Sequence, residues 1–279
     1  MKYFIFPRGL LLFCLFAGLT QAVVSSEPGA QETERGVQTV QSAVLKESGQ
    51  SWDLRSGARD LMATKDVKEE ASETLSYLLF FPKNESQKTD AGFPMILFLH
   101  GMGERGSQPF DVAKIGLPAL LKAKSVAETF PFLVISPQCP DGKCWSAKQL
   151  SEFLDQMLEK YPVDRNRVYV TGLSMGGFGT WALLAERPDA FAAAIPICGG
   201  CDPAKAEKLV SVPIWAFHGD ADPIVPPALT RRMVEAIQQA GGTKVRSTFL
   251  MAIHHNAWDY VYCNPDVFAW LLEHERGQN

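Results

Sequence analysis

This 279-residue sequence has no excess of positive charge, few cysteines and few long apolar runs. Its 27 Lys and Arg residues are outnumbered by 31 Asp and Glu residues, which gives a formal net charge of −4. There is thus no basic excess of the kind that marks a nucleic-acid-binding surface. No internal repeat is evident, which excludes repeat architectures. With 46% hydrophobic and 21% charged residues, the chain is long enough for one large globular core.

The most apolar run lies at the N-terminus and is short. MKYFIFPR carries Lys2 and Arg8, and it is followed by GLLLFCLFAGL and then by TQA. This order is typical of a secretory signal peptide over residues 1–22, and a retained membrane anchor is the alternative. The run is shorter than the roughly 20 residues that a spanning helix needs. We therefore expect a secreted or periplasmic protein without stable membrane association after cleavage.

The rest of the chain divides by composition. Residues 23–50 are rich in Ser, Gln, Glu and Gly and contain no aromatic residue, and the next 20 residues have no assignable pattern. We expect residues 23–70 to be a flexible or poorly assigned leader. Residues 71–279 are then expected to form one domain.

Few cysteines are available for disulfides or metal binding. Beyond the signal peptide they are Cys139, Cys144, Cys198, Cys201 and Cys263. A bridge across the PDGK turn between the first two is feasible, and the odd count leaves at least one thiol unpaired. The C-x-x-C spacing of Cys198 and Cys201 is that of redox motifs, but we favour a structural role. No second pair of ligands has metal-site spacing, so no metal is expected.

Apolar strands and amphipathic helices alternate along residues 76–275. Strands are expected at 76–81, 94–100, 132–137, 167–173, 191–197, 212–218 and 245–251, and helices at 147–160, 175–187, 227–240 and 266–275. This alternation predicts an α/β fold with a mostly parallel sheet and helices on both faces. The functional groups of such sheets lie at the carboxyl ends of the strands.

One serine is placed between glycines directly after a predicted strand. In VTGLSMGGFGT, Ser174 has Gly172 and Gly176 two residues to either side. The G-x-S-x-G pattern alone is weak, but a strand before it and a helix after it predict the sharp turn that exposes a nucleophilic serine. A glycine-rich loop without chemistry is the alternative.

A serine nucleophile needs a histidine base and an acid that orients it. His255, which opens HNAWDY, is our candidate base, with the adjacent His254 as the alternative. In HGDADPIVP, Asp222 is the candidate acid, and Asp220 is expected to shape the turn. His100, His218 and His274 are expected to have turn-shaping or surface roles.

A developing oxyanion needs backbone N–H donors. Met175 opens the helix after the serine, and Met102 follows the strand that ends in His100, so their N–H groups are the candidate oxyanion donors. An ordinary glycine turn is the alternative for the loop at Met102. Glu104 and Arg105 are expected to pair and fix this loop.

Five separated motifs together resemble a known group of enzymes. They are FLHGMGERG, ISPQCP, YPVDRNRVYVTGLSMGGFGTWALLAERPDAFAAAIPICGG, VPIWAFHGDADPIVP and HHNAWDYVY. Over residues 72–276 the chain resembles α/β-hydrolase esterases of the predicted peptidase and phospholipase/carboxylesterase-like group, related to feruloyl esterases and polyhydroxybutyrate depolymerase-like hydrolases. The resemblance implies the α/β-hydrolase fold, with Ser174 as nucleophile, Asp222 as acid and His255 as base. Cys201 and Cys263 depart from the family pattern, and we hypothesise a bridge between them.

These observations predict an exported serine hydrolase that cleaves small-molecule or polysaccharide-linked carboxylic esters without a cofactor. A peptidase on the same fold, a binding protein without turnover and a thiol–disulfide protein are the alternatives. Trp145, Trp181, Trp258 and Gln138 are weaker candidates for contacts with the substrate.

Overall fold

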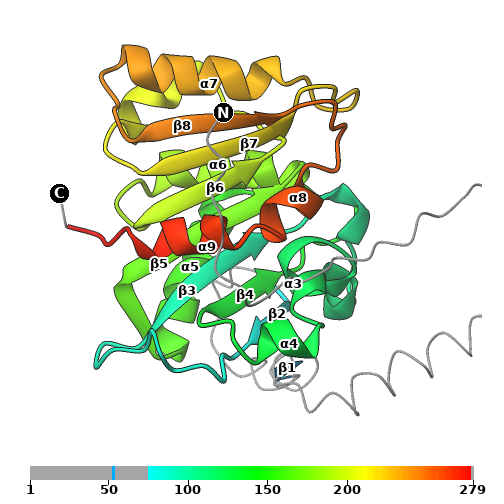
Figure 1. The fold of residues 1–279 in the computed structure, drawn as a ribbon, viewed down its shortest axis with the longest axis vertical. Helices are drawn as coiled ribbons and strands as arrows, with labels where there is room; N and C mark the ends of the chain where they lie inside the picture. The colour runs from blue at the N-terminus through cyan, green and yellow to red at the C-terminus, as the bar shows by residue number, and fades with distance from the viewer. Residues whose placement is uncertain (1–51, 54–74, 278–279) are drawn as a thin grey trace, which may run out of the picture. The chain divides into compact units, whose positions relative to one another are not determined.

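One twisted sheet runs through the part of the chain that the structure describes (Figure 1). The structure is a computed structural model that describes residues 52–53 and 75–277. Within these residues the sheet has eight strands in the order β1-β2-β4-β3-β5-β6-β7-β8. The pairs β1–β2 and β2–β4 are antiparallel, whereas every pair from β4 to β8 is parallel. The expected mostly parallel sheet is therefore present.

The elements alternate as the apolar pattern predicts. The strands are β1 (Trp52–Asp53), β2 (Tyr77–Phe80), β3 (Phe93–Leu99), β4 (Leu133–Pro137), β5 (Val163–Leu173), β6 (Ala193–Ile197), β7 (Ile214–Gly219) and β8 (Val245–Leu250). The α-helices are α3 (Gly116–Leu120), α4 (Lys124–Ala127), α5 (Ala147–Lys160), α6 (Met175–Glu186), α7 (Ala228–Gln239), α8 (Trp258–Tyr262) and α9 (Pro265–Leu272). Three 3-10 helices are η3 (Met102–Glu104), η4 (Pro109–Lys114) and η5 (Pro203–Leu209).

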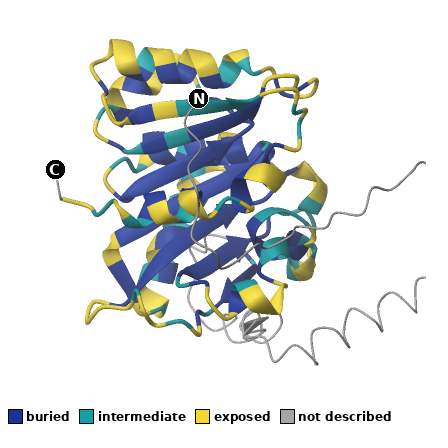
Figure 2. Ribbon diagram, viewed as in Figure 1, coloured by how far each residue is buried: buried dark blue, intermediate teal, exposed yellow. Residues whose placement is uncertain are grey.

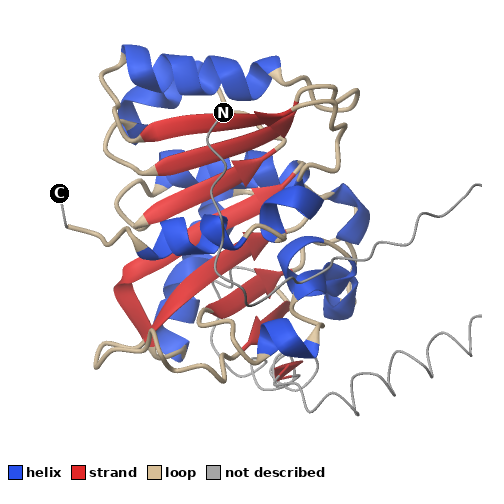
Figure 3. Cartoon of the chain, in the orientation of Figure 1, coloured by secondary structure: helices blue, strands red, loops and turns tan. Residues whose placement is uncertain are grey.

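Helices cover both faces of the sheet (Figure 3). Alternate residues along each strand point to opposite faces, so each buried strand contributes to two apolar layers. In β3, Leu97 and Leu99 pack in the layer under α5, α6 and α7. Ile96 and Phe98 pack in the other layer, with α3, α8 and α9. The central strands β3, β4 and β6 are buried along their whole length, as Figure 2 shows for the centre of the sheet.

The strand ends bring the candidate residues to one edge. Because β3, β5, β7 and β8 are parallel neighbours or near neighbours, the loops that leave their carboxyl ends meet at the same edge of the sheet. These loops carry Met102, Ser174, Asp222 and His255.

Several expectations concern residues outside the described part of the chain. The signal peptide over residues 1–22 lies there, as does most of the range 23–70, of which β1 alone is described and pairs with β2. In the part of the chain that is described, no helix combines the length and apolar character needed to cross a membrane.

Candidate active site

Ser174 occupies a sharp turn between β5 and α6. Its backbone has φ +53° and ψ −117°, a conformation that residues with a Cβ rarely adopt. Its N–H donates to the carbonyl of Ile197 at the end of β6, at 3.0 Å, which anchors the turn to the neighbouring strand. Strain of this kind persists only where the surrounding structure fixes it, and here it projects the hydroxyl beyond the sheet edge.

The two glycines that flank the serine are required by close packing. A Cβ on Gly172 would collide with the backbone of Gly176, and a Cβ on Gly176 would overlap the carbonyl oxygen of Leu99 in β3. The turn can therefore pass this close to the neighbouring strand only without side chains at these positions.

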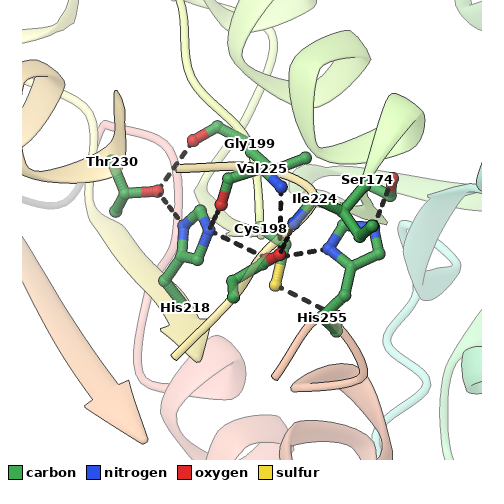
Figure 4. A network of polar contacts seen from close by, with 9 residues as sticks. Ser174, Cys198, Gly199, His218, Ile224, Val225, Thr230 and His255 are labelled. Carbon is green, nitrogen blue, oxygen red and sulfur yellow. Dashed lines mark hydrogen bonds and ion pairs between the residues drawn. The ribbon is translucent and has the colours of Figure 1, made fainter. Parts of the chain in front are cut away.

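A continuous hydrogen-bonded chain joins the three candidate residues (Figure 4). His255 Nε2 lies 2.9 Å from Ser174 Oγ, and His255 Nδ1 lies 2.7 Å from Asp222 Oδ2. A proton on Nδ1 that is donated to the carboxylate leaves Nε2 free to accept the serine proton. The His255 ring also packs edge-on against Trp258 of α8, with centroids 5.1 Å apart, which restricts its orientation.

Asp222 is held as a carboxylate by hydrogen-bond donors. Its Oδ1 accepts from the N–H groups of Ile224 at 2.8 Å and Val225 at 2.9 Å, while Oδ2 faces His255. Burial raises the pKa of Asp222, but the hydrogen bonds from His255, Val225 and Ile224 outweigh it, so that the pKa lies below its ordinary value. The side chain is thus a buried anion beside the imidazole.

Asp220 and His254, the alternative acid and base, are not part of this hydrogen-bonded chain. Asp220 accepts from the N–H of Ala252 at 2.7 Å and so supports the loop after β8. Ala252 has φ +56°, a strained conformation that the hydrogen bond stabilises. Asp220 therefore braces a neighbouring loop rather than its own turn, and the side chain of His254 is exposed to solvent.

Met102 and Met175 both line the cavity that contains Ser174. Each is the first residue of its helix, η3 or α6, so its N–H has no acceptor within that helix. The expected Glu104–Arg105 pair is absent from the described residues. Arg105 instead donates from Nε to the carbonyl of Met102 and from Nη1 to that of Lys143, both at 3.1 Å, because these carbonyls lie within reach of its guanidinium.

His100 fixes the loop that precedes Met102. Its Nε2 accepts from the N–H of Cys139 at 2.9 Å, so the ring proton must lie on Nδ1, which donates to the carbonyl of Gly101 at 2.6 Å. Burial lowers the pKa of His100 to about 4, so the ring is neutral near pH 7. Its expected turn-shaping role is confirmed. Gln138 has a similar structural role, since its amide donates to the carbonyl of Glu104 at 3.0 Å.

An apolar cavity of about 580 Å³ opens beside Ser174. Its lining residues are Met102, Cys144, Trp145, Ser174, Met175, Phe178, Gly179, Ala182, Gly200, Cys201, Ile224, Val225, Pro226 and Leu229. No charged side chain is among them. Of the three tryptophans considered in the sequence, Trp145 alone lines the cavity, whereas Trp181 is fully buried in the core and Trp258 supports His255.

The described cysteines form no disulfide. Neither the feasible Cys139–Cys144 bridge nor the hypothesised Cys201–Cys263 bridge is present. Burial raises the pKa of Cys198 to about 12, which keeps its thiol protonated and unreactive near pH 7. This chemistry disfavours the thiol–disulfide alternative.

One group of potential metal ligands lies in the same region. Donor atoms of Cys198, His218 and Asp222 lie within 4.8 Å of one another, and all three residues are buried. The Asp222 oxygens already accept from His255, Ile224 and Val225. The cluster is therefore a closed hydrogen-bonded network rather than an open coordination site.

Comparisons with known proteins support the fold and the expected resemblance. A model of the prolyl oligopeptidase family matches residues 141–207. Acetylxylan esterase A of Emericella nidulans is 34% identical over 111 residues, which span 34% of this chain and 33% of that protein. Poly(3-hydroxyalkanoate) depolymerase C of Paucimonas lemoignei is 32% identical over 127 residues, which span 39% of this chain and 28% of that protein. The chain thus spans about a third of the length of these two relatives.

A solved structure extends the similarity over most of the described domain. The crystal structure of a thermostable esterase matches with a TM-score of 0.62 and 35% identity, covering 72% of this chain and 60% of that one. Together with the sheet topology, these similarities confirm the expected α/β-hydrolase fold and the resemblance to esterases.

Proposed function

We propose that this chain, an α/β-hydrolase similar to named esterases, is a serine hydrolase that cleaves carboxylic esters through an acyl-serine intermediate. The observation that carries the proposal is the chain of short hydrogen bonds from Ser174 through His255 to Asp222, beside an uncharged cavity. A serine hydroxyl is a poor nucleophile near neutral pH, and this arrangement supplies the base and the orienting acid that it needs.

The proposed reaction uses each group once in acylation and again in deacylation. His255 Nε2 takes the proton of Ser174 as its Oγ attacks the ester carbonyl carbon. The oxyanion that forms is stabilised by the N–H groups of Met102 and Met175. His255 then gives its proton to the leaving alcohol oxygen as the ester bond breaks. Water, deprotonated by His255, attacks the acyl-serine, and the carboxylic acid leaves as the proton returns to Ser174 Oγ.

The cavity lining favours an uncharged acyl group. Met102, Phe178 and Ile224 at the cavity are large apolar side chains that remain more than a third exposed to solvent. Burying such surface against an apolar substrate group is favourable, whereas no lining side chain offers a partner for a charged one. We infer small or medium-sized acyl groups, carried by a small-molecule or polysaccharide-linked ester.

Export is a further part of the proposal and rests on residues 1–22. Their basic start, apolar centre and small residues at positions 20 and 22 are typical of a signal peptide. N-terminal sequencing of the protein recovered from the culture medium or periplasm would test this. A mature chain that begins near residue 23 is expected, and an intact N-terminus on a membrane-bound protein would contradict it.

A fluorophosphonate probe tests the nucleophile directly. We expect the wild-type protein to be labelled and to hydrolyse p-nitrophenyl acetate, butyrate and octanoate. Ser174→Ala should lose both activities while its circular dichroism and melting temperature stay close to wild type. Ser146→Ala is the matched control, because Ser146 is exposed, caps α5 and is not itself among the residues that line the cavity. Labelling that persists in Ser174→Ala, or is lost in Ser146→Ala, would overturn the assignment.

Peptide hydrolysis is the second candidate function, because a prolyl oligopeptidase family model matches residues 141–207. The cavity lining contains no carboxylate that would bind a peptide amino terminus. Rates on p-nitroanilides and p-nitrophenyl esters with the same acyl group separate the two candidates. Comparable kcat/KM on both would favour the peptidase, and a large preference for the ester would favour the esterase.

A further inference from the structure

His218 is a fully buried histidine that the proposed reaction does not use. It lies near the end of β7, four residues before Asp222 (Figure 4). Its Nδ1 lies 2.7 Å from Thr230 Oγ1 in α7. Its Nε2 lies 2.9 Å from the carbonyl oxygen of Val225 and 3.2 Å from Asp222 Oδ2. Both ring nitrogens are therefore in short polar contacts.

The charge of the His218 ring follows from which atoms in these contacts can donate a proton and which can only accept one. Thr230 Oγ1 lies 2.7 Å from the carbonyl oxygen of Gly199, which can only accept, so the single hydroxyl proton is directed there. The hydroxyl oxygen must then accept a proton from His218 Nδ1. On the other side of the ring, Nε2 faces a carbonyl and a carboxylate, and both are acceptors. Each ring nitrogen therefore has to donate.

A neutral ring would leave one of these contacts unsatisfied. With the proton on Nε2 alone, the Thr230 hydroxyl would have to donate to Nδ1. The lone pairs of the Thr230 hydroxyl oxygen and of the Gly199 carbonyl oxygen would then face each other at 2.7 Å. With the proton on Nδ1 alone, the lone pair of Nε2 would face the Asp222 carboxylate. Buried polar groups in native structures are rarely left in such contacts, because they have lost water without gaining a partner.

We propose that His218 is a buried imidazolium cation, paired with Asp222, and that it is a positioning residue for the acid of the active site. Its catalytic consequence rests on the proposed function, whereas its charge does not. Asp222 then lies between two histidines, with Oδ2 2.7 Å from His255 Nδ1 and 3.2 Å from His218 Nε2. The His218 ring also holds Val225, whose N–H donates to Asp222 Oδ1, so both carboxylate oxygens are fixed.

The titratable groups that face the His218 ring are Asp222, His255 and Cys198. Burial is the largest influence on the pKa of His218, and with a positive charge on His255 it outweighs the carbonyl of Val225 and the Asp222 carboxylate, so that the pKa lies below its ordinary value. The charge of the ring is therefore assigned from the hydrogen bonds alone, in which both ring nitrogens face acceptors. Cys198 is a neutral thiol near pH 7, since burial raises its pKa to about 12. The carboxylate is thus the anion that compensates the buried cation.

The same network joins the acid to the nucleophile turn. Thr230 in α7 connects His218 to Gly199, and the backbone of Gly199 packs directly against that of Gly177 in the first turn of α6. A displacement of the acid loop would therefore disturb the helix that begins beside Ser174. His218 thus helps to hold Asp222 and Ser174 in a fixed position relative to each other.

The ring charge can be measured without any turnover. Histidine labelled with ¹⁵N in the wild-type protein is expected to show one ring with both nitrogens protonated, unchanged from pH 6 to pH 8. Thr230→Ser, which keeps the hydroxyl, identifies the His218 signals by a small displacement. A His218 ring with one unprotonated nitrogen at pH 7 would overturn the proposal, whether or not the protein is an esterase.

The positioning role is tested by the pH dependence of kcat/KM. His218→Asn keeps an N–H donor but removes a positive charge that opposes the gain of a second positive charge in the active site. We expect the acid limb of the profile to move to higher pH by about one unit or more, with kcat reduced more than KM. Thr230→Ser should leave the limb in place. An unmoved limb in a folded His218→Asn protein refutes the role. Should that variant not fold, the wild-type spectrum still decides the charge. Absence of fluorophosphonate labelling at Ser174 would contradict the proposed esterase function, whereas the ¹⁵N spectrum would still report the charge of the His218 ring.

Discussion

Replacing Asp222 with asparagine is the sharpest perturbation of the proposed mechanism, because it changes one atom of the hydrogen-bonded chain. The oxygen of the introduced amide can still accept from the N–H groups of Ile224 and Val225, which lie 2.8 and 2.9 Å from Oδ1 of the native carboxylate. The NH₂ group of the amide then takes the place of Oδ2, 2.7 Å from His255 Nδ1. Two donors cannot share that contact, so His255 must place its proton on Nε2.

The expected loss follows from that change of tautomer. With Nε2 protonated, His255 can no longer accept the proton of Ser174, 2.9 Å away. The corresponding change in a Ser-His-Asp triad lowers kcat by about 10⁴. This factor equals about 5.5 kcal/mol in the activation free energy. We therefore expect Asp222→Asn to lower kcat on p-nitrophenyl butyrate by about this factor, with a much smaller change in KM.

The neighbouring carboxylate supplies a matched control. Asp220 is two residues away, but it accepts from Ala252 and belongs to the loop after β8. Asp220→Asn should therefore keep kcat within a few-fold of wild type. Steady-state kinetics at several pH values, together with thermal melts of both variants, would make the comparison. Near-wild-type turnover in Asp222→Asn, or equal losses in both variants, would refute the reasoning.

Three further predictions concern packing, charge and the cavity. Gly176→Ala should destabilise the fold by about 2 kcal/mol or more in urea unfolding, because the new Cβ would overlap backbone atoms of β3; a near-wild-type midpoint would contradict this. Asp164→Asn should cost about 3 kcal/mol, since it leaves the buried Arg167 cation without its partner at 2.8 Å, whereas Asp155→Asn at an exposed pair should cost at most about 1 kcal/mol. Burial raises the pKa of Asp164, but its hydrogen bonds to Arg167 outweigh this and lower it. The carboxylate therefore stabilises the fold above its unfolded pKa of about 3.9, and acid titration below that value should cost wild type more than Asp164→Asn. Ala182→Leu should fill part of the cavity and lower kcat/KM for the octanoate ester relative to the acetate ester, and an unchanged ratio would show that the acyl chain binds elsewhere.

The long elements follow from local pattern, which is why the sequence predicts them well. Helix α5 has the expected bounds, because its apolar residues recur on one face and Ser146 caps its first turn by accepting from the N–H of Gln149. Short helices such as α3 and α4 have no such periodicity and were not predicted. Strand β5 begins at Val163 rather than at residue 167, because an irregular pairing with Phe93 extends it.

The geometry of Ser174, His255 and Asp222 was also predictable, because each follows a strand end and parallel strands bring those ends together. Contacts between distant segments were not. The sequence indicated only a turn-shaping role for His218, since its partners Thr230 and Gly199 become neighbours only when α7 and the loop after β6 fold together. The expected disulfide between Cys201 and Cys263 was wrong for the same reason, because proximity in three dimensions cannot be read from motif position.

The positive φ of Ser174 has a consequence for how this protein would respond to selection. A conformation of φ +53° and ψ −117° is tolerated far better by glycine than by any residue with a Cβ. Alanine would keep the strain, whereas glycine would relieve it, by an amount on the order of 1–3 kcal/mol. Directed evolution for heat resistance alone would therefore favour glycine at position 174, which would remove the proposed nucleophile and enrich clones without the proposed activity. A screen of this protein must select for turnover and thermal tolerance together, because the two demands oppose each other at the same residue.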